Sequence, residues 1–248
     1  MQIDYFEKHW VNNNNVVPDA KKTSALHFLD IIKKPALENS LILDAGCGDG
    51  VHLAVLDAFF GVKRAVGIDI SHNALVKLKR QIKELALYQA DICRLPFANG
   101  AFDVTYSFGV LAYTEDPWRG LSELYRVTRH EGWIGVWLAP RQTGLLWTLF
   151  LLIRGLTTKL PQFWQNRIAD CLVPFLGFLP TTSGCRLGKS TWRQCREVIL
   201  VNIAPKHLYF PSAEEIKKNI ATLGVKSIFP VEGLPGGFWF TKDEGHDC

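Results

Sequence analysis

Three glycines separated by single residues lie in the segment Asp44-Ala45-Gly46-Cys47-Gly48-Asp49-Gly50. An apolar run of strand length at 41–43 comes before this segment, and the apolar spacing of 51–60 predicts a helix after it. Glycines at a strand-to-helix turn let a ligand touch the backbone at the N-terminus of a helix. The segment therefore predicts a loop that binds a nucleotide or a nucleotide-like cofactor.

The glycine spacing distinguishes between cofactors. Dinucleotide-binding folds use Gly-x-Gly-x-x-Gly, which admits a pyrophosphate. The third glycine would fall on Val51 when counted from Gly46 and on Leu53 when counted from Gly48, so neither register fits. Gly-x-Gly-x-Gly preceded by an acid, Asp44, instead resembles motif I of the class I S-adenosylmethionine-dependent methyltransferases. The resemblance implies a cofactor without phosphates. An acid beside the loop suits the amino-acid portion of that cofactor.

A second carboxylate, Asp69, lies in Gly67-Ile68-Asp69-Ile70-Ser71, at the end of a predicted strand and 19 residues after Gly50. A carboxylate at this place can accept hydrogen bonds from both hydroxyls of a ribose, in dinucleotide-binding and methyltransferase folds alike. Taken with the loop spacing, Asp69 supports a cofactor that contains adenosine.

The segment from Ala90 to Val104 resembles the part of the same family that runs from the third strand into the fourth. The resemblance implies that Asp91 holds the adenine amino group, that Ile92 offers its backbone amide to the ring and that Ile70 packs on the adenine face. It places Ser107 at the methionine end of the cofactor. The match extends over 41–138 and implies S-adenosyl-L-methionine as cofactor and S-adenosyl-L-homocysteine as product. Its cofactor-binding set is Asp44, Gly46, Cys47, Gly48, Gly50, Asp69, Ile70, Asp91, Ile92 and Ser107.

Apolar runs of strand length alternate with segments of helical period, which predicts a doubly wound α/β fold. The family implies a seven-stranded, mostly parallel, Rossmann-like sheet with its last strand antiparallel. Ser212 and Glu215 predict a capping box on a late helix. The predicted strands are 41–43, 64–68, 87–90, 102–108, 133–138, 225–229 and 238–241, and the predicted helices 51–60, 73–85, 117–129 and 212–223.

Four regions follow from this pattern. Residues 1–39 are predicted as an N-terminal helical cap and 40–140 as the cofactor-binding core. Residues 141–210 break the alternation and predict a helical insertion that acts as a substrate lid. Residues 211–248 are predicted as a closing helix and antiparallel hairpin. Glu131-Gly132-Trp133 stands where many relatives have Pro-Gly-Gly, so the same turn is expected there.

The insertion carries the positive charge of the chain. Nine Lys/Arg and two acids lie in 141–210, which gives this segment +7 of a total of +4. Its apolar parts, 144–156 and 168–179, have two interpretations. In the first, they form a helical hairpin that completes the core. In the second, they form an apolar acceptor pocket, or 141–180 contacts an anionic membrane surface, with Arg141, Arg154 and Lys159 at the flanks.

Tyr113 and His207 are the two candidates for catalytic work. Tyr113 follows the fourth strand, where it faces the acceptor as an acid or base or forms an aromatic wall. His207 precedes the capped helix, where it contacts substrate or lies on the surface. An N-terminal aromatic cluster either covers the cofactor, whose sulfonium it would stabilise, or packs a terminal helix. The cluster consists of Tyr5, Phe6, His9 and Trp10.

The function predicted from these residues is methyl transfer to oxygen, nitrogen or carbon of a small, lipophilic or anionic acceptor. A noncatalytic scaffold or sensor that binds S-adenosylmethionine or S-adenosylhomocysteine is the alternative, and a nicotinamide-dependent oxidoreductase is a weaker one. A DNA acceptor is disfavoured because Ser107-Phe108-Gly109-Val110 stands where base-amino enzymes have Asn/Asp-Pro-Pro-Tyr/Phe; RNA stays open.

The histidines, the cysteines and the N-terminus bear on metal binding and on the compartment of the protein. The seven histidines include no pair with Cys or carboxylate at ligand spacing, so no metal site is expected. Six scattered cysteines and an N-terminus without a secretory pattern predict a cytoplasmic protein, in peripheral contact with a membrane if the insertion binds lipid. The longest apolar stretch is too short to cross a bilayer. No obligate protein partner is indicated.

Overall fold

A computed structural model describes residues 5–8, 25–30, 39–62, 64–82, 85–174, 192–225 and 227–243. The chain divides into two compact units. The first, here called the sheet unit, comprises residues 3–140 and 209–248. The second, here called the helical unit, comprises residues 141–208.

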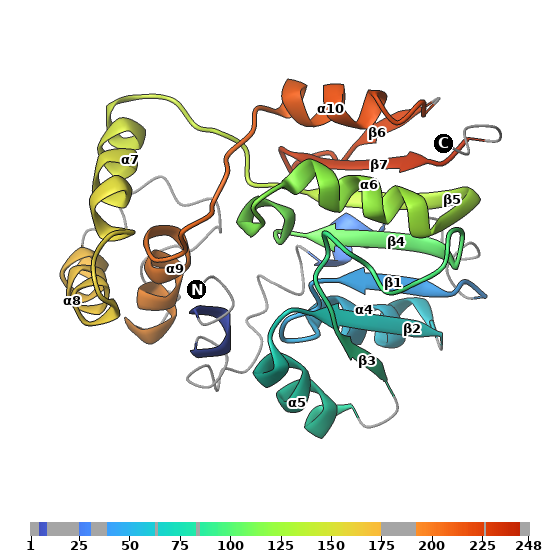
Figure 1. Ribbon diagram of the computed structural model, residues 1–248, viewed down its shortest axis with the longest axis horizontal. Coiled ribbons are helices and arrows are strands. Elements are labelled where there is room, and N and C mark those ends of the chain that lie inside the picture. The colour runs from blue at the N-terminus through green and yellow to red at the C-terminus, as the bar shows by residue number, and fades with distance from the viewer. Residues whose placement is uncertain are drawn as a thin grey trace. The chain divides into compact units, whose positions relative to one another are not determined.

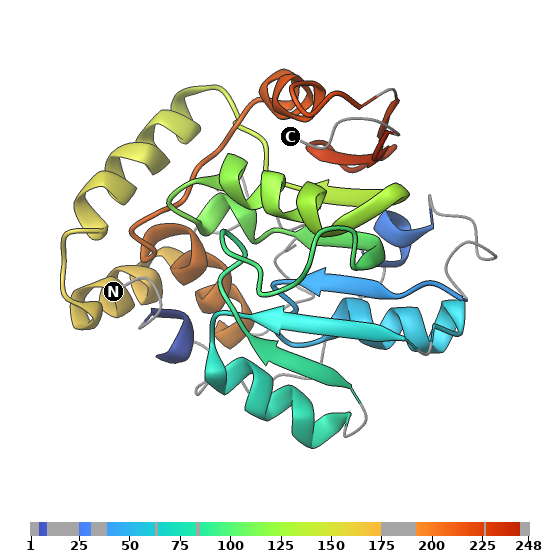
Figure 2. The same ribbon diagram turned by 45° about the vertical axis from the view of Figure 1, so that its right-hand side comes forward.

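The sheet unit contains one seven-stranded sheet in the order β3-β2-β1-β4-β5-β7-β6 (Figure 1). Strands β1 to β5 are parallel, and β7 runs antiparallel to both β5 and β6. The strands fan out from β1 toward β3 (Figure 2), as the right-handed twist of a parallel sheet requires. The predicted seven-stranded, mostly parallel fold is confirmed. The strands are β1 Ile42–Ala45, β2 Ala65–Asp69, β3 Ala86–Gln89, β4 Phe102–Phe108, β5 Thr128–Trp137, β6 Ile228–Pro230 and β7 Gly237–Thr241.

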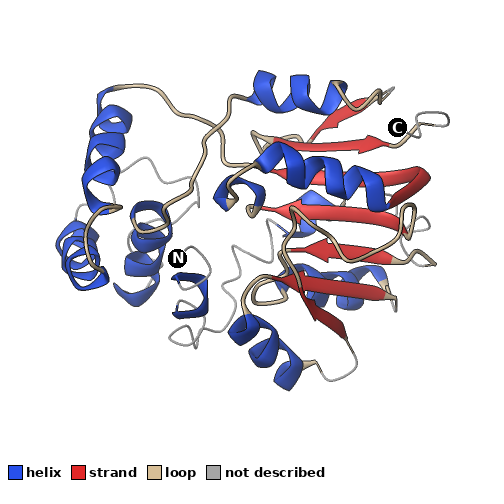
Figure 3. Ribbon diagram, in the orientation of Figure 1, coloured by secondary structure: helices blue, strands red, loops and turns tan. Residues whose placement is uncertain are grey.

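Helices connect the parallel strands and cover both faces of the sheet. In Figures 1 and 3, α6 crosses in front of β4 and β5, while α4 passes behind β1 and β2. Ser71 caps α5 by accepting from the Ala74 amide at 3.2 Å, as predicted. Asp116 caps α6 in the same way, with Pro117 in its first turn. The helices of this unit are α4 Val51–Phe60, α5 His72–Gln81, the 3-10 turn η1 Leu111–Tyr113, α6 Pro117–Val127 and α10 Ala213–Ala221.

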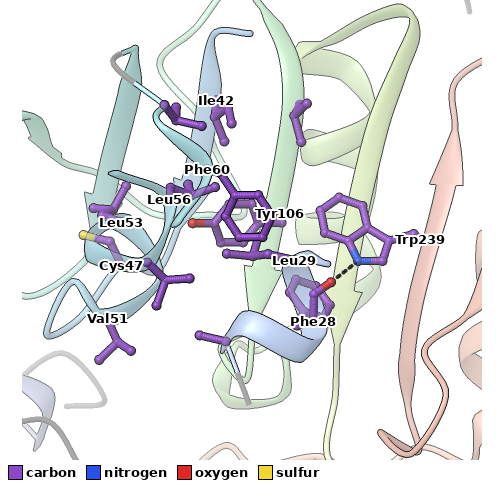
Figure 4. Close-up of a cluster of buried hydrophobic side chains, with 14 of the residues drawn as sticks. Phe28, Leu29, Ile42, Cys47, Val51, Leu53, Leu56, Phe60, Tyr106 and Trp239 are labelled. Carbon is purple, nitrogen blue, oxygen red and sulfur yellow. Dashed lines mark hydrogen bonds between the residues drawn. The ribbon is translucent and has the colours of Figure 1, made fainter. Parts of the chain in front are cut away.

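A buried aromatic cluster fixes the middle of the sheet unit (Figure 4). The Trp239 indole is fully buried, and its Nε1 donates to the Phe28 carbonyl at 2.8 Å. This bond joins helical residues 25–29 to β7. The indole fits only because position 135 is glycine, since a Cβ there would lie 2.5 Å from its ring.

Several predicted boundaries in the sheet unit are wrong, among them that of the strand predicted over 225–229, which spans 228–230. The helix predicted over 73–85 ends at Gln81, because Ile82 is extended. Ile82 and Leu85 still pack on the core, and this burial produced the apolar spacing that was read as helix. The turn expected at Glu131-Gly132-Trp133 is an irregularity inside one long strand, β5, where Glu131 has a positive φ of 59°.

The helical unit consists, in its described residues, of α7 Leu145–Thr157, α8 Gln162–Leu172 and α9 Trp192–Ile203. The sequence analysis predicted a helical insertion here but did not identify α9 as a separate helix. Its signal is the spacing of Cys195, Ile199 and Ile203, which are buried against α8. Part of the apolar segment predicted at 168–179 lies outside the described residues. Among the helices that are described, none has the length and apolar character to cross a bilayer.

Candidate functional site

The glycine loop connects β1 to α4 at the carboxyl end of the parallel strands. Gly46, Gly48 and Gly50 all have positive φ, at 91°, 49° and 75°, the region that side chains rarely adopt. A Cβ on Gly46 would lie 2.3 Å from Val110 Cγ2, so this glycine also permits a close approach. The Gly46 and Cys47 amides both donate to the Ile68 carbonyl at 2.8 Å. The loop is therefore held against the end of β2.

Asp69 joins this loop to the start of α5. Its Oδ2 accepts from the Gly48 amide at 3.0 Å, and its Oδ1 accepts from the Ser71 amide at 2.8 Å. Burial raises the pKa of Asp69 despite these amide bonds. Each carboxylate oxygen has a second lone pair, so Asp69 can accept further hydrogen bonds while it holds the loop.

Asp44 is a buried acid with an unsatisfied oxygen. It lies beside Tyr106 in the register of β1 and β4. Within the described part of the chain neither Asp44 Oδ2 nor the Tyr106 hydroxyl has a hydrogen-bond partner. Burial raises the pKa of Asp44 to about 8, against a lowering effect of the nearby Tyr106 hydroxyl, and the charges of Asp69 and Asp49 raise it further. A cation in this place would stabilise the carboxylate.

Two other predicted residues lie buried near the same strand ends. Ser107 is fully buried in β4, and its hydroxyl has no partner among the described residues. Cys47 is buried in the loop, and burial raises the pKa of its thiol well above the usual value. A thiol with a raised pKa stays protonated at neutral pH and is a poor nucleophile. Cys47 therefore suits a packing role.

The adenine residues implied by the resemblance lie on segments that follow β2 and β3. Asp91 is exposed, and its Oδ1 accepts from the Cys93 amide at 2.8 Å, which shapes the turn. Ile92 is buried, while Ile70 is half-buried and its carbonyl accepts from Gln89 Nε2 at 3.0 Å. Ile70 directly follows Asp69 in the chain. Asp91 directly follows Ala90, and the Ala90 amide donates to the Asp69 carbonyl, which joins the segment after β3 to the end of β2.

The sequence analysis missed Glu7. Residues 5–8 are helical, and the Glu7 carboxylate accepts from the amides of His72 and Asn73 at 2.7 and 2.9 Å and from the Ser71 hydroxyl at 3.0 Å. It thus caps α5 beside Asp69. No spacing signal exists for a contact between residues more than sixty positions apart.

The same short helix reaches the end of β4. The Phe6 ring packs edge-on against Tyr113, with centroids 5.6 Å apart. Residues 5–8 therefore contact both the segment after β2 and the segment after β4, the two strands that flank β1. Of the predicted aromatic cluster, Tyr5 and Phe6 lie in this helix, while His9 and Trp10 lie outside the described residues.

The two catalytic candidates belong to different units. Tyr113 ends η1 in the sheet unit and is half-buried. His207 is half-buried in the helical unit. In the described ranges no group of three or more His, Cys, Asp or Glu could hold a metal ion.

Known proteins resemble this chain over the same residues that form the site. A model of the methyltransferase domain family matches residues 43–136. A malonyl-[acyl-carrier protein] O-methyltransferase from Pectobacterium atrosepticum is 29% identical over 83% of this chain and 72% of its own length. A tRNA U34 carboxymethyltransferase from Cellvibrio japonicus is 38% identical over 39% of this chain and 32% of its own length.

A solved S-adenosylmethionine-dependent methyltransferase from Thermotoga maritima has the same fold. It superimposes with a TM-score of 0.55 at 14% identity, over 90% of this chain and 89% of that one. The chain contains a methyltransferase domain with the class I S-adenosylmethionine-dependent fold. The chain spans only about two fifths of the length of the first curated relatives it matches: 38%, 43% and 37%. The matched residues of the family model run from β1 to β5 and include all the predicted cofactor-binding residues.

Proposed function

We propose that this chain binds S-adenosylmethionine at the carboxyl ends of β1, β2 and β4 and transfers its methyl group to a small-molecule acceptor. The observation that carries the proposal is the buried acid Asp44, whose Oδ2 lacks a partner in the described structure. A cationic ligand relieves the cost of burying that charge. The cofactor carries two positive groups, the ammonium of its amino-acid portion and the sulfonium.

The chain's own residues divide the work of holding this cofactor. Asp44 and the loop glycines receive the amino-acid portion, and Ser107 supplies a hydroxyl at the same end. Asp69 accepts the ribose hydroxyls with the lone pairs that its two amide bonds leave over. The remaining residues, Ile70, Asp91 and Ile92, surround the adenine.

When bound, the cofactor supplies a methyl carbon, which bonds to the acceptor atom while the carbon–sulfur bond breaks and its electron pair passes to sulfur. The proton of the acceptor, where it has one, passes to a base or to water. Alignment of reactants contributes up to roughly 7–11 kcal/mol in favourable intramolecular reactions, so the protein's main task is positioning. Tyr113 is proposed to form the acceptor side of the site.

The electrostatics of the site disfavour a nicotinamide cofactor. Burial raises the pKa values of Asp44 and Asp69; the charges of Asp69 and Asp49 raise that of Asp44 further, and the charge of Glu7 raises that of Asp69. A pyrophosphate placed there would add negative charge to an acidic site. The glycine spacing argues in the same direction.

The acceptor is proposed to be small and either lipophilic or anionic. The similarity to the malonyl-[acyl-carrier protein] enzyme supports this class, because it extends over 83% of this chain. RNA is the competing acceptor, and it draws support from the tRNA-modifying relative, whose match covers 39% of this chain.

Calorimetric titration with S-adenosylmethionine, S-adenosylhomocysteine and NADH tests the proposal. We expect selective binding of the first two. A screen for transfer of labelled methyl then compares acyl and isoprenoid acids, other anionic metabolites and total RNA. Binding without transfer to any of them would favour the noncatalytic scaffold, and binding of NADH alone would refute the cofactor assignment.

A further inference from the structure

The described part of the helical unit presents an unusual helix, α7. Four leucines spaced by four, three and four residues form a single stripe along it. These side chains are Leu145, Leu149, Leu152 and Leu156, with exposed fractions of 84%, 49%, 63% and 69%. A solvated helix face ordinarily carries polar residues.

The buried residues of α7 are Trp147 and two polar residues, Arg154 and Thr157. The Arg154 guanidinium donates to the carbonyls of Asn202 and Pro205 at 2.7 Å each and to that of Lys206 at 3.3 Å. Thr157 Oγ1 donates to the Ile203 carbonyl at 2.9 Å. These carbonyls lie at and just after the C-terminal end of α9, where no further helical turn supplies amide donors to them. The sequence analysis is wrong in placing Arg154 at a membrane flank, because α9 requires it inside.

Aromatic and basic side chains are also exposed on α8. Phe163 and Trp164 are 60% and 56% exposed. The Arg167 guanidinium lies over the Phe163 ring, 5.4 Å from its centroid. Lys159, between α7 and α8, is also exposed. Exposed leucines together with exposed aromatic rings and cations are typical of helices that lie in a membrane interface.

The charge of the helical unit distinguishes between two partners for this surface, a second copy of the chain and an anionic membrane. Its only acids in the sequence are Asp170 and Glu197, and Arg196 pairs with them at 2.7 and 3.6 Å. Both acids of this unit therefore already pair with Arg196, and the unit has no further acid for Lys159 or Arg167. A second copy would bring the same positive charge and be repelled, whereas anionic lipid headgroups attract it.

We propose that the leucine stripe of α7, together with Phe163, Trp164, Lys159 and Arg167, docks this protein on the surface of an anionic lipid bilayer. The helix has 13 residues and is about 20 Å long, so it lies along the interface and does not cross it. This inference goes beyond the proposed function and does not depend on catalysis.

Sedimentation of the full chain with lipid vesicles tests the proposal. Vesicles of phosphatidylcholine are compared with vesicles that also contain phosphatidylglycerol, at low and high salt. We expect binding to the anionic vesicles, and at least about a tenfold loss of partitioning in the double variant Leu149→Glu/Leu152→Glu. We expect Lys159→Gln/Arg167→Gln to weaken binding and its salt dependence. Phe59→Glu, at an exposed residue of α4, is the matched control.

Each other outcome overturns the proposal. Unchanged binding of the leucine variant would show that another surface meets the lipid. Equal binding to neutral and anionic vesicles would remove the charge argument. Concentration-dependent dimers that the leucine variant abolishes, without lipid binding, would make a second copy the occupant. Unchanged binding of S-adenosylmethionine by each variant verifies that it is folded, and keeps this test separate from that of methyl transfer.

Discussion

The Asp69 carboxylate accepts a hydrogen bond from the Gly48 amide at 3.0 Å. The acid proposed to hold the cofactor ribose thus also holds the loop proposed to receive the amino-acid portion. With its second oxygen on the Ser71 amide, Asp69 ties together the loop after β1 and the cap of α5. Removing this carboxylate should therefore disturb two parts of the site at once.

Asp69→Asn is expected to weaken S-adenosylmethionine binding by about ten- to a hundredfold. Hydrogen bonds to a charged group contribute roughly 1.5–3 kcal/mol. Calorimetric titration measures the change, and Asp57→Asn, at an exposed residue of α4, is the control for loss of a carboxylate. Equal affinity in both variants would remove Asp69 from the site.

Asp44 predicts how stability depends on pH without cofactor. Its folded pKa is raised to about 8, above its unfolded value, so the native state binds the proton more tightly. The contribution of Asp44 is therefore fully present at acid pH and falls as the pH rises toward 8. Urea unfolding should show this fall in the wild type and a flatter profile in Asp44→Asn.

Asp44 also predicts that cofactor binding is linked to proton release. A cationic ligand favours the carboxylate, so S-adenosylmethionine should bind more tightly as the pH rises to about 8. Calorimetry in buffers of different ionisation enthalpy measures the released proton. Asp44→Asn separates this effect from titration of the ligand's own amine. A proton count that is the same in the variant would contradict the assignment.

Gly46→Ala should abolish cofactor binding and destabilise the protein. The φ of 91° is strained for alanine by about 1–2 kcal/mol, and the new Cβ would lie 2.3 Å from Val110 Cγ2. Adding Val110→Ala should remove the two closest atoms but leave Val110 Cβ at 2.8 Å and the φ strain, so the double variant should recover stability only in part. Thermal unfolding of the three variants tests this, and complete recovery would show that backbone strain is negligible.

Glu7→Gln should destabilise the protein by about 0.5–1 kcal/mol, since an N-terminal cap and a charge at the start of α5 are weakened. Burial alone would raise the pKa of Glu7, but its bonds to Asn73, His72 and Ser71 lower it overall. The stabilisation is therefore present above its ordinary pKa of 4.5 and is lost as the pH falls through the lower folded value. Urea unfolding curves of variant and wild type should converge in acid, and Glu232→Gln, exposed on the same unit, should not differ at any pH.

Trp239→Phe should lower the free energy of unfolding by about 1–3 kcal/mol. The change removes the indole donor from the Phe28 carbonyl and leaves a void in the aromatic cluster. Chemical unfolding measures the loss. Trp164→Phe is the matched control because Trp164 is exposed, and its curve should overlay that of the wild type.

The sequence by itself determined the order of strands and helices around the glycine loop. Strand β4 and helix α4 begin and end as predicted, and Ser71 and Ser212 cap their helices. These features depend on local spacing and on residues at most a few positions apart. Only half of the predicted capping box is confirmed. Ser212 accepts from the Glu215 amide, but the Glu215 carboxylate accepts from the Tyr209 hydroxyl.

Only the tertiary structure decided which groups face each other. Asp44 meets Tyr106 because β1 pairs with β4, and Glu7 reaches α5 across more than sixty residues. In α7 the sequence left the burial of the leucines open and placed Arg154 at a flank, whereas the structure exposes the four leucines of the stripe and buries Arg154. Arg154 is inside because carbonyls 48 to 52 residues later need its donors. Burial depends on such distant partners, which no local pattern of residues records.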